Sequence, residues 1–324
     1  MLIRLLSAAD VRQALPMSEA IAAMRVAFAE MAAGTARVPL RTSLSTGRGV
    51  TLFMPGYLAG SNSLAQKVVS VYAGNAERGL PVINGVVLVL DSETGVPRAI
   101  LDGGTLTAIR TGAAAGLATD LLARPDCRVL ALFGAGGQAY DQVQAVLAVR
   151  PIRQVRILSR SGRSCQALAR RLREEGIDAI SMRDPATAIR DADIISCATP
   201  ATEPLFADAD VPDGAHINLV GAFTPQMQEA PPETVARARV IVDDVEAALE
   251  EAGDLLKPLG AGLIDREHFS TTLGDLLAGR APGRQSDQEI TLFKSVGLAA
   301  QDVAAAAQAL QIAETRDLGV LVEL

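Results

Sequence analysis

The feature that most constrains this chain is a glycine-rich turn that directly follows a short apolar run. The run 128–133 is apolar after its first residue, as expected for a buried strand of a parallel sheet. The next six residues, Gly134-Ala-Gly-Gly-Gln-Ala139, match the pattern G-x-G-x-x-G/A, and a helical segment follows to about residue 149. A turn of this kind between a strand and a helix is typical of a dinucleotide site.

Each small residue of the turn has its own physical role. Gly134 permits the tight turn, and Gly136 lets a pyrophosphate approach the backbone. Ala139 is small enough for the helix to pack close to the strand, and the helix N-terminus offers N–H groups to the phosphates. The alternative interpretation is a glycine-rich connection without a functional role.

Composition and charge exclude several classes of protein. The chain has 324 residues, of which 49% are hydrophobic, so it is long and apolar enough for two folded domains. The net charge is −7 and no long basic run occurs, which argues against nucleic acid or an anionic membrane as partner. No uncharged run is long enough to span a bilayer, and early charged residues interrupt any signal-peptide core. Three cysteines without a CxxC pair predict free thiols and a cytoplasmic location.

Two regions of the chain differ in their rhythm of strands and helices. Residues 38–101 predict antiparallel strands, with a hairpin turn at 92–95, and a helix follows at 105–122. From Cys127 on, strands alternate with helices, which predicts an α/β fold with a doubly wound parallel sheet. The expected strands of that sheet are 128–133, 154–158, 194–198, 216–220 and 239–242. The segment from about residue 291 is expected to be helical and then strand-like at 319–324.

The residues after the second strand of this region bear on the choice of cofactor. NAD sites usually carry a carboxylate there to hold the ribose 2′-hydroxyl. Here the chain reads Leu158-Ser-Arg-Ser161, in which Arg160 can pair with a 2′-phosphate and Ser159 and Ser161 can add hydroxyl groups. The sequence therefore favours NADP(H). The alternative is a solvated surface Arg160 in a protein that takes either NADP(H) or NAD(H).

Few residue types are available for acid–base chemistry. The chain has two histidines, His216 and His268, and no metal-ligand spacing, so we expect no metal site and a structural role for His216. Lys67 lies in an otherwise uncharged strand and shares one face with alternate apolar residues. By itself this pattern favours a lysine that reaches the surface over a lysine held in a pocket.

A set of motifs along nearly the whole chain resembles the ornithine cyclodeaminase/mu-crystallin family. The most specific is Leu101-Asp-Gly-Gly-Thr-Leu-Thr-Ala-Ile-Arg-Thr-Gly-Ala-Ala-Ala-Gly116. The others are Lys67-Val-Val-Ser-Val-Tyr-Ala-Gly-Asn75, Gly79-Leu-Pro81, the Gly134 turn and Phe293-Lys-Ser-Val-Gly297. The resemblance implies a Rossmann-type doubly wound sheet inserted into a mixed α+β substrate and dimerisation domain. It implies a substrate and dimerisation domain at 1–117, a dinucleotide domain at 118–292, a returning C-terminal segment at 293–324, and a homodimer.

The same resemblance implies which residues form the site. The substrate-site residues of the family match Arg41, Lys67 and Arg110, and two arginines suit the carboxylate of a small imino- or amino-acid substrate. A desolvated lysine beside them can pass a proton. The expected cofactor-binding residues are Thr111, Gly134, Ala135, Gly136, Gly137, Gln138, Ser159, Arg160, Ser161, Thr199, Val220, Gly221, Ala222 and Ser295.

Three departures from the cyclodeaminase pattern indicate which activity to expect. Ornithine cyclodeaminases carry an aspartate where this chain has Phe223, and a glutamate where it has Leu52. They also place an acidic residue after the second Rossmann strand, where this chain has Ser159-Arg160. The site has lost carboxylates that would bind a cationic ornithine side chain, so the resemblance implies a ketimine reductase that forms L-proline or L-pipecolate.

Other activities of the family remain as alternatives. They are an ornithine cyclodeaminase, a related amino-acid dehydrogenase and a non-enzymatic small-ligand-binding protein of the mu-crystallin kind. Three acidic residues, Asp102, Asp243 and Asp244, are open candidates for proton transfer, although Asp102 is expected to cap or orient the following helix.

Overall fold

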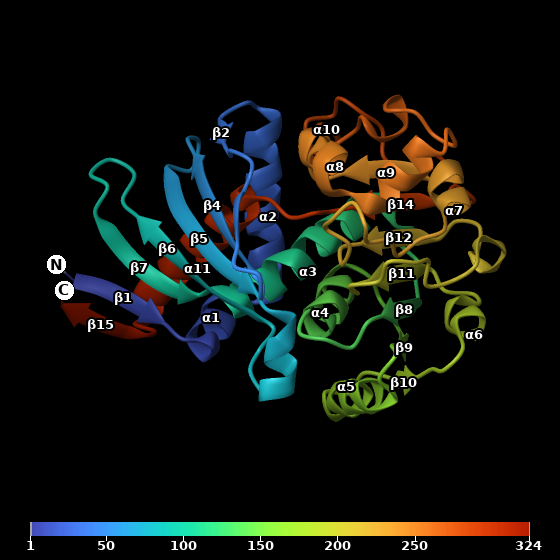
Figure 1. Ribbon diagram of the computed structural model, residues 1–324, viewed down its shortest axis with the longest axis horizontal. Coiled ribbons are helices and arrows are strands. Elements are labelled where there is room, and N and C mark those ends of the chain that lie inside the picture. Colours follow the sequence, from blue (N-terminus) through green and yellow to red (C-terminus); the bar gives the residue numbers. More distant parts are fainter. Residues whose placement is uncertain (1, 324) are drawn as a thin grey trace. The chain divides into compact units, whose positions relative to one another are not determined.

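The computed structural model describes residues 2–323, apart from the side chain of Ala76. It divides into two compact units (Figure 1). The eight-strand unit comprises the chain up to Arg110 and from Leu298 on, and the seven-strand unit comprises Thr111–Gly297. The unit boundaries at Arg110 and Gly297 differ by a few positions from the expected domain boundaries at residues 117 and 292. The reason at the C-terminal side is that β14 (Thr291–Lys294) is a strand of the seven-stranded sheet.

The eight-strand unit is built on a mixed sheet with the order β15-β1-β7-β6-β5-β4-β2, and β3 pairs with β4. Consecutive strands from β4 to β7 pair antiparallel, as the sequence predicted, and the turn before Gly95 connects β6 to β7. The pair β1–β7 is parallel, which the strand pattern did not reveal. The strands are β1 (Leu2–Leu6), β2 (Ala36–Arg37), β3 (Thr42–Ser45), β4 (Val50–Leu58), β5 (Ser63–Val71), β6 (Ile83–Leu90), β7 (Pro97–Asp102) and β15 (Val320–Glu323).

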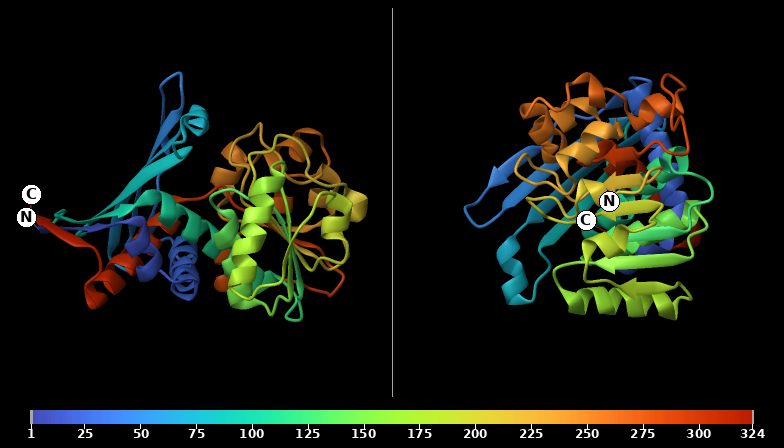
Figure 2. Two further views of the ribbon diagram at one scale, coloured as in Figure 1. Left: turned by 90° about the horizontal axis from the view of Figure 1, so that it is seen from below. Right: turned by 90° about the vertical axis from the view of Figure 1, so that its right-hand side faces the viewer.

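Helices cover one face of this sheet. Figure 2 shows α1 (Ala8–Ala14), α2 (Met17–Ala32) and α11 (Ala299–Arg316) on the same side of the strands. The contact is close, because a Cβ added at Gly56 of β4 would lie 2.8 Å from the side chain of Val303 on α11. In β5, alternate residues Ala65, Lys67 and Val69 are buried, as expected for a strand with one covered face. The face of the sheet toward α11 is therefore covered.

The seven-strand unit contains a parallel sheet with the order β10-β9-β8-β11-β12-β14-β13. The expected doubly wound α/β fold is confirmed. Its strands are β8 (Val129–Phe133), β9 (Gln154–Leu158), β10 (Ala179–Ser181), β11 (Ile194–Cys197), β12 (His216–Leu219), β13 (Arg239–Val242) and β14. The expectation of helix from residue 291 was wrong at its start, because Thr291–Lys294 pairs with β12 and β13. A segment of four residues is too short to show a period that separates strand from helix.

The helices of this unit follow the strands along the chain. They are α3 (Gly103–Leu122), which begins before the boundary between the units, α4 (Ala139–Val149), α5 (Gly162–Glu174), α6 (Pro185–Ile189), α7 (Pro232–Arg237), α8 (Val245–Glu251), α9 (Gly253–Gly260) and α10 (Leu273–Leu277). Helices α7, α8, α9 and α10 and strand β10 were not predicted. Short 3₁₀ turns lie at Ala73–Arg78, Asp208–Asp210 and Glu267–Phe269.

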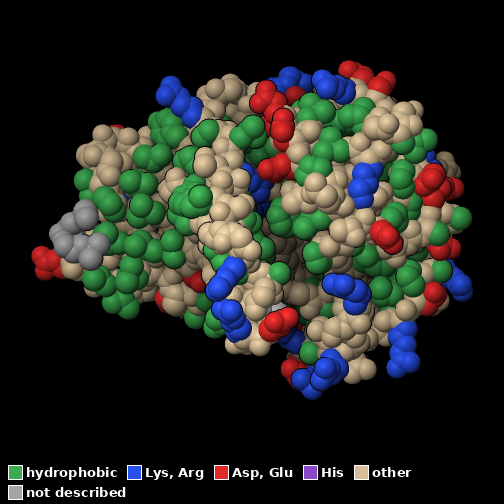
Figure 3. Space-filling model, in the orientation of Figure 1, with side chains coloured by type: hydrophobic (Ala, Val, Ile, Leu, Met, Phe, Trp, Pro, Cys, Tyr) green, Lys and Arg blue, Asp and Glu red, His purple; other side chains and the backbone are tan. Residues whose placement is uncertain are grey.

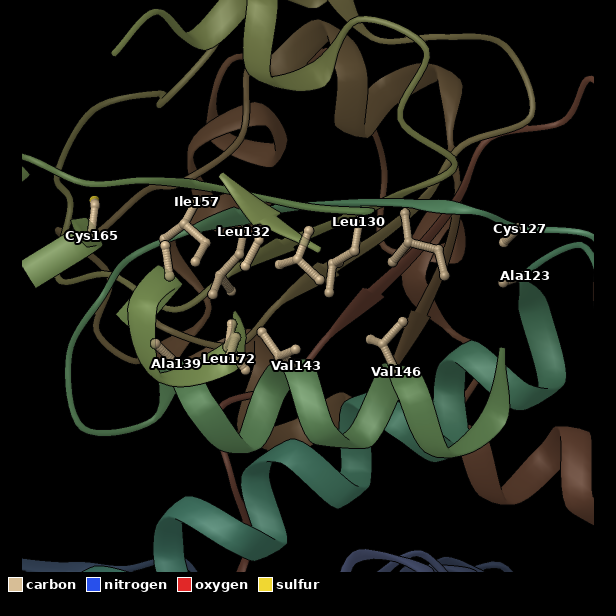
Figure 4. Packing of buried hydrophobic residues seen from close by; sticks show 14 residues of the cluster. Ala123, Cys127, Leu130, Leu132, Ala139, Val143, Val146, Ile157, Cys165 and Leu172 are labelled. Atoms are coloured by element: carbon tan, nitrogen blue, oxygen red, sulfur yellow. The ribbon is translucent and has the colours of Figure 1, made fainter. Parts of the chain in front are cut away.

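The core of the seven-strand unit supports the glycine turn. Figure 4 shows Ala139, Val143 and Val146 of α4 facing Leu130 and Leu132 of β8. All five side chains are buried. Ala139 therefore lets the first turn of α4 approach the strand, as its small size predicted.

Some smaller features of the chain bear on the earlier expectations. The three cysteines are free and buried. Among residues 2–323, no helix combines the length and the apolar character required to cross a membrane. His216 is buried and bonded to Thr291 and Asn218, and burial lowers its pKa to about 3. A neutral imidazole inside β12 agrees with the structural role expected for it.

Candidate active site and nucleotide cavity

A cavity of about 530 Å³ lies beside the glycine turn in the seven-strand unit. Its lining comes from the ends of β8, β9 and β11 and from the loops that follow them, which is where ligands bind in doubly wound sheets. Seven expected cofactor residues line it: Gly134, Ala135, Gly136, Ser159, Arg160, Ser161 and Thr199. The segment after β9 supplies an arginine and hydroxyl groups, whereas Glu203 supplies a carboxylate from the loop after β11.

The turn itself has room for a dinucleotide. Gly134 adopts φ +108°, a conformation that favours glycine, and a Cβ there would lie 2.6 Å from the carbonyl oxygen of Ala198. A Cβ added at Gly136 would meet nothing within 4 Å, so its backbone faces open space. The eleven-residue α4 begins directly after the turn. These residues fit the pyrophosphate of a nicotinamide dinucleotide.

The remaining expected cofactor residues do not line this cavity. Gly137 and Gln138 belong to the same turn, and Thr111 is buried on α3. Ser295 donates its hydroxyl to Asp243. The other three, Val220, Gly221 and Ala222, form the loop directly after β12. Their assignment to cofactor binding stays a prediction.

A buried carboxylate that the sequence analysis missed holds two of these loops together. Glu229 Oε1 accepts hydrogen bonds from the N–H and hydroxyl of Thr199, at 2.7 and 2.9 Å. Its Oε2 accepts from the N–H groups of Gly221 and Ala222, at 2.8 and 3.2 Å. Burial, and then the charge of Asp254, raise the pKa of Glu229 to about 7. Asp254 in turn accepts the backbone N–H of Glu229 and lies 2.8 Å from Lys294 Nζ.

The three expected catalytic residues belong to the eight-strand unit. Lys67 is only 2% exposed, so the interpretation as a surface lysine was wrong. Its Nζ lies 2.6 Å from Asp302 Oδ2. Arg110, the residue of α3 at which the eight-strand unit ends, donates from Nε to Asp302 Oδ1 at 3.0 Å. One carboxylate therefore joins Lys67 to Arg110.

Gln301 and Asp302 were not predicted. Gln301 Oε1 accepts a hydrogen bond of 2.6 Å from Arg110 Nη1. Both residues lie in the first turn of an alanine-rich helix, where an acidic residue is ordinarily explained by the helix dipole. The sequence does show two polar residues on an otherwise apolar helix face. That pattern indicates a functional role only once the face is known to be buried.

Polar groups without partners surround Arg110. Within residues 2–323, buried Gln301 Nε2 and Thr107 Oγ1 lack a hydrogen-bond partner, and Thr107 precedes Arg110 by one turn of α3. Buried polar atoms normally find partners, so these atoms indicate a place where a polar ligand binds. Arg41 is half-buried just before β3, and its positive charge lowers the pKa of Lys67. The charges of Arg110 and Arg41 thus both act on Lys67, so the three predicted cations influence one another.

The other acidic candidates already have structural roles. Asp102 accepts the N–H of Thr105 and caps α3, as expected. Asp243 accepts from the Ser295 hydroxyl and from the N–H groups of Val296 and Gly297. Asp244 caps α8 through the N–H of Ala247. No group of three His, Cys, Asp or Glu side chains suited to a metal occurs in the part of the chain that the structure describes.

Comparison with known proteins identifies the family. The family model described as ornithine cyclodeaminase/mu-crystallin family matches residues 3–316, and the chain belongs to this family. A Δ1-pyrroline-2-carboxylate reductase from Bacillus cereus is 40% identical, over 98% of this chain and 99% of that protein.

Two solved structures share the whole architecture. The Thermococcus litoralis Δ1-pyrroline-2-carboxylate reductase in complex with NADH and L-proline has a TM-score of 0.95 and 38% identity, over 98% of this chain and 99% of that chain. An archaeal alanine dehydrogenase dimer with bound NAD has a TM-score of 0.94 and 33% identity, over the full length of both chains. The family and the Rossmann-type fold expected from the sequence are therefore confirmed.

The two glycines of the turn provide a matched pair of substitutions. Gly136→Ala adds a methyl group in open space, so the melting temperature should not change, while the dissociation constant for a nicotinamide dinucleotide should rise tenfold or more, about 1.4 kcal/mol. Gly134→Ala should lower the free energy of unfolding by about 1–3 kcal/mol, because its φ is strained and its Cβ meets Ala198. Thermal melting and NAD(P)H fluorescence titration measure both effects. Undiminished binding by Gly136→Ala would remove the pyrophosphate from this turn.

Proposed function

We propose that this protein reduces cyclic ketimines that carry a carboxylate, with NAD(P)H as the reductant. The products are L-proline from Δ1-pyrroline-2-carboxylate and L-pipecolate from Δ1-piperideine-2-carboxylate. The observation that carries the proposal is the buried Lys67, paired with Asp302 beside Arg110, in a chain 40% identical to a reductase of this kind. The similar Thermococcus litoralis structure contains NADH and L-proline, a cofactor and a product of the proposed reaction.

The seven-strand unit would hold the cofactor. Gly134, Ala135 and Gly136 would contact the pyrophosphate, and the segment Ser159–Ser161 would contact the adenosine ribose. When bound, the reduced nicotinamide supplies a hydride. Glu229 keeps the loops after β11 and β12 joined at the edge of the sheet where dinucleotides lie.

The eight-strand unit would hold the substrate. The guanidinium groups of Arg110 and Arg41 bind the carboxylate, since arginine pairs with carboxylates through two parallel hydrogen bonds. Lys67, whose pKa lies at about 8, keeps a proton at neutral pH and shares it with the imine nitrogen. A protonated imine has an electrophilic carbon, so the hydride adds there and an amine results.

A lyase that deaminates ornithine is the second candidate, since the family carries that activity in its name. Such an enzyme must bind a cationic side chain, which calls for carboxylates facing the substrate. Phe223 and Leu52 stand at two positions where the cyclodeaminase pattern has acidic residues, and Leu52 is 8% exposed. Asp302 is already engaged by two cations. These contacts favour the reductase.

NADPH oxidation with five- and six-membered cyclic imino acids tests the proposal directly. The wild-type protein should oxidise NADPH with one or both and release no ammonia from ornithine. Lys67→Ala should lose at least a hundredfold in turnover, because the imine loses its proton source, while fluorescence titration should give an unchanged Kd for NADPH. Turnover close to wild type in Lys67→Ala would remove the lysine from the mechanism.

The other outcomes of this assay separate the alternatives. Ammonia release from ornithine would identify a cyclodeaminase, and NAD-dependent oxidation of alanine would identify an amino-acid dehydrogenase. Tight binding of an aromatic ligand without any turnover would favour a binding protein. Each of these results would contradict the reductase.

We propose further that NADP(H) is preferred over NAD(H). Arg160 and two serines line the cavity after β9, where NAD sites usually carry a carboxylate. The two similar structures contain NADH and NAD, so this preference is a property of the present chain and needs its own test.

Arg160→Ala should lower kcat/KM for NADPH about tenfold or more and leave kcat/KM for NADH within about twofold. The reason is that the guanidinium would pair with the 2′-phosphate, which NADH lacks. Arg163→Ala is the matched control, because Arg163 lies on α5 outside the cavity lining. Equal losses with both cofactors would contradict the preference.

We also propose a homodimer formed through the eight-stranded sheet. Exposed large hydrophobic side chains gather on this unit, and Figure 3 shows a face rich in hydrophobic side chains at the side where β1 and β15 lie. Those on the strands are Leu2, Leu5, Leu44, Ile83, Val86, Val320 and Leu321. Exposed apolar patches of this kind mark protein–protein interfaces.

Val86→Glu should convert a two-chain particle into a single chain, because a charge in the centre of an apolar interface is costly to bury. Ile180→Glu is the control, since Ile180 is 40% exposed on β10 of the other unit against 46% for Val86. Sedimentation equilibrium measures the particle mass of both variants. A wild-type protein that sediments as one chain would contradict the dimer.

A further inference from the structure

Asp302 lies at the centre of the expected substrate site, between Lys67 and Arg110. It lies in the first turn of α11 and is 1% exposed. Its Oδ2 lies 2.6 Å from Lys67 Nζ on β5, and its Oδ1 accepts from Arg110 Nε on α3 at 3.0 Å. Three elements thus meet at a single side chain.

The charges around Lys67 act in opposite directions. Burial lowers its pKa most, and the positive charges of Arg110 and Arg41 lower it further. Asp302 raises it, both by its charge and by a hydrogen bond. The balance is a pKa of about 8, below the usual value of 10.5. Asp302 therefore opposes the burial and the two arginines, and it favours the protonated form of Lys67.

The same carboxylate orients Arg110. Asp302 accepts a hydrogen bond from Nε of the guanidinium, and Gln301 accepts one from Nη1. Within residues 2–323, Nη2 makes no hydrogen bond and Nη1 keeps its second hydrogen. The edge formed by Nη1 and Nη2 is therefore still able to bind a carboxylate through two bonds.

We propose that Asp302 is a positioning residue that maintains the ammonium form of Lys67 and presents the outer edge of Arg110 to the substrate carboxylate. This inference rests on the proposed imine reduction. In that reaction, an N–H bond of the lysine ammonium breaks and an N–H bond forms on the imine. A bound reduced nicotinamide would supply the hydride for the C–H bond, and the electron pair of the C=N π bond would become the nitrogen lone pair. The neutral lysine regains a proton from water, because Asp302 stabilises the ammonium.

Asp302→Asn tests the proposal through the pH dependence of turnover. In the wild type, kcat should fall as the pH rises through about 8, since Lys67 loses its proton there. The variant removes a negative charge in direct contact, so this fall should move to lower pH by roughly one to three units. Turnover should then drop tenfold or more at pH 8 and recover partly at pH 6. A purely structural role for Asp302 would lower turnover equally at both pH values.

The chain permits a direct measurement of the lysine that does not depend on any activity. It contains three lysines, Lys67, Lys257 and Lys294, so selective ¹³C labelling of lysine gives three Cε signals that Lys→Arg variants assign. In Asp302→Asn the midpoint of the Lys67 signal should fall. Lys294 is an internal reference, because it is also buried and lies 2.8 Å from Asp254 in the other unit.

Two further variants complete the test. Arg110→Gln removes a positive charge from the surroundings of Lys67, so the Lys67 midpoint should rise, and this holds even if Asp302→Asn does not fold. Glu30→Gln is the control, because Glu30 is a buried carboxylate of the same unit that binds the N–H groups of Gly60 and Ser61. It should leave the Lys67 midpoint unchanged.

The outcomes distinguish this inference from the proposed function. An unchanged Lys67 midpoint in Asp302→Asn would overturn the role of Asp302. If that variant does not fold, an unchanged midpoint in Arg110→Gln would overturn it. A shift of the midpoints in the expected directions, together with a wild-type protein that reduces no imine, would overturn the reductase and leave the charge relation between Asp302 and Lys67 intact. Shifted midpoints with a matching shift in the pH profile would support both.

Discussion

The ion pair between Lys67 and Asp302 is the interaction on which the proposed chemistry depends. An ammonium and a carboxylate that are both almost fully buried are costly unless they neutralise each other. In this protein they do so at 2.6 Å, and Arg110 completes the cluster. Because the three side chains come from β5, α11 and α3, the pairing of these elements and the charge state of the lysine depend on one another. The same contact therefore links the packing of three elements to the proposed reactivity.

A second buried charge cluster plays a comparable part in the seven-strand unit. Glu229 joins Thr199 to the Gly221 loop, and its neighbour Asp254 pairs with Lys294 on β14. The Glu229 carboxylate accepts hydrogen bonds from N–H groups just beyond the carboxyl ends of β11 and β12. These two ends lie side by side, because β11 and β12 are neighbouring parallel strands. A Cβ at Gly221 would lie 2.1 Å from the Thr199 nitrogen, so glycine is required for this approach. The rim of the nucleotide cavity is thus held by a side chain that does not line it.

Much of the fold could be predicted because its signals are local. The strand β8, the turn at Gly134 and the start of α4 are consecutive in sequence, and each is constrained by residue size and backbone conformation. The strands β4 to β7 carry period-two patterns that are visible without any partner. Strand β14 and the parallel pair β1–β7 were not foreseen, because both depend on partners that are distant in the chain.

By itself, the sequence determined the class of sheet, the glycine turn, the absence of a carboxylate after β9 and the family whose motifs carry Arg41, Lys67 and Arg110. The tertiary structure decided which charges meet. It buried Lys67, which the strand pattern alone favoured at the surface and the family motifs placed in the site, and it selected Asp302 and Glu229 from 37 acidic residues. The physical reason is that the energy of a charge depends on burial and on neighbours within a few ångströms, and distant segments supply both. Residues 110 and 302 lie 192 positions apart, and only folding makes them partners.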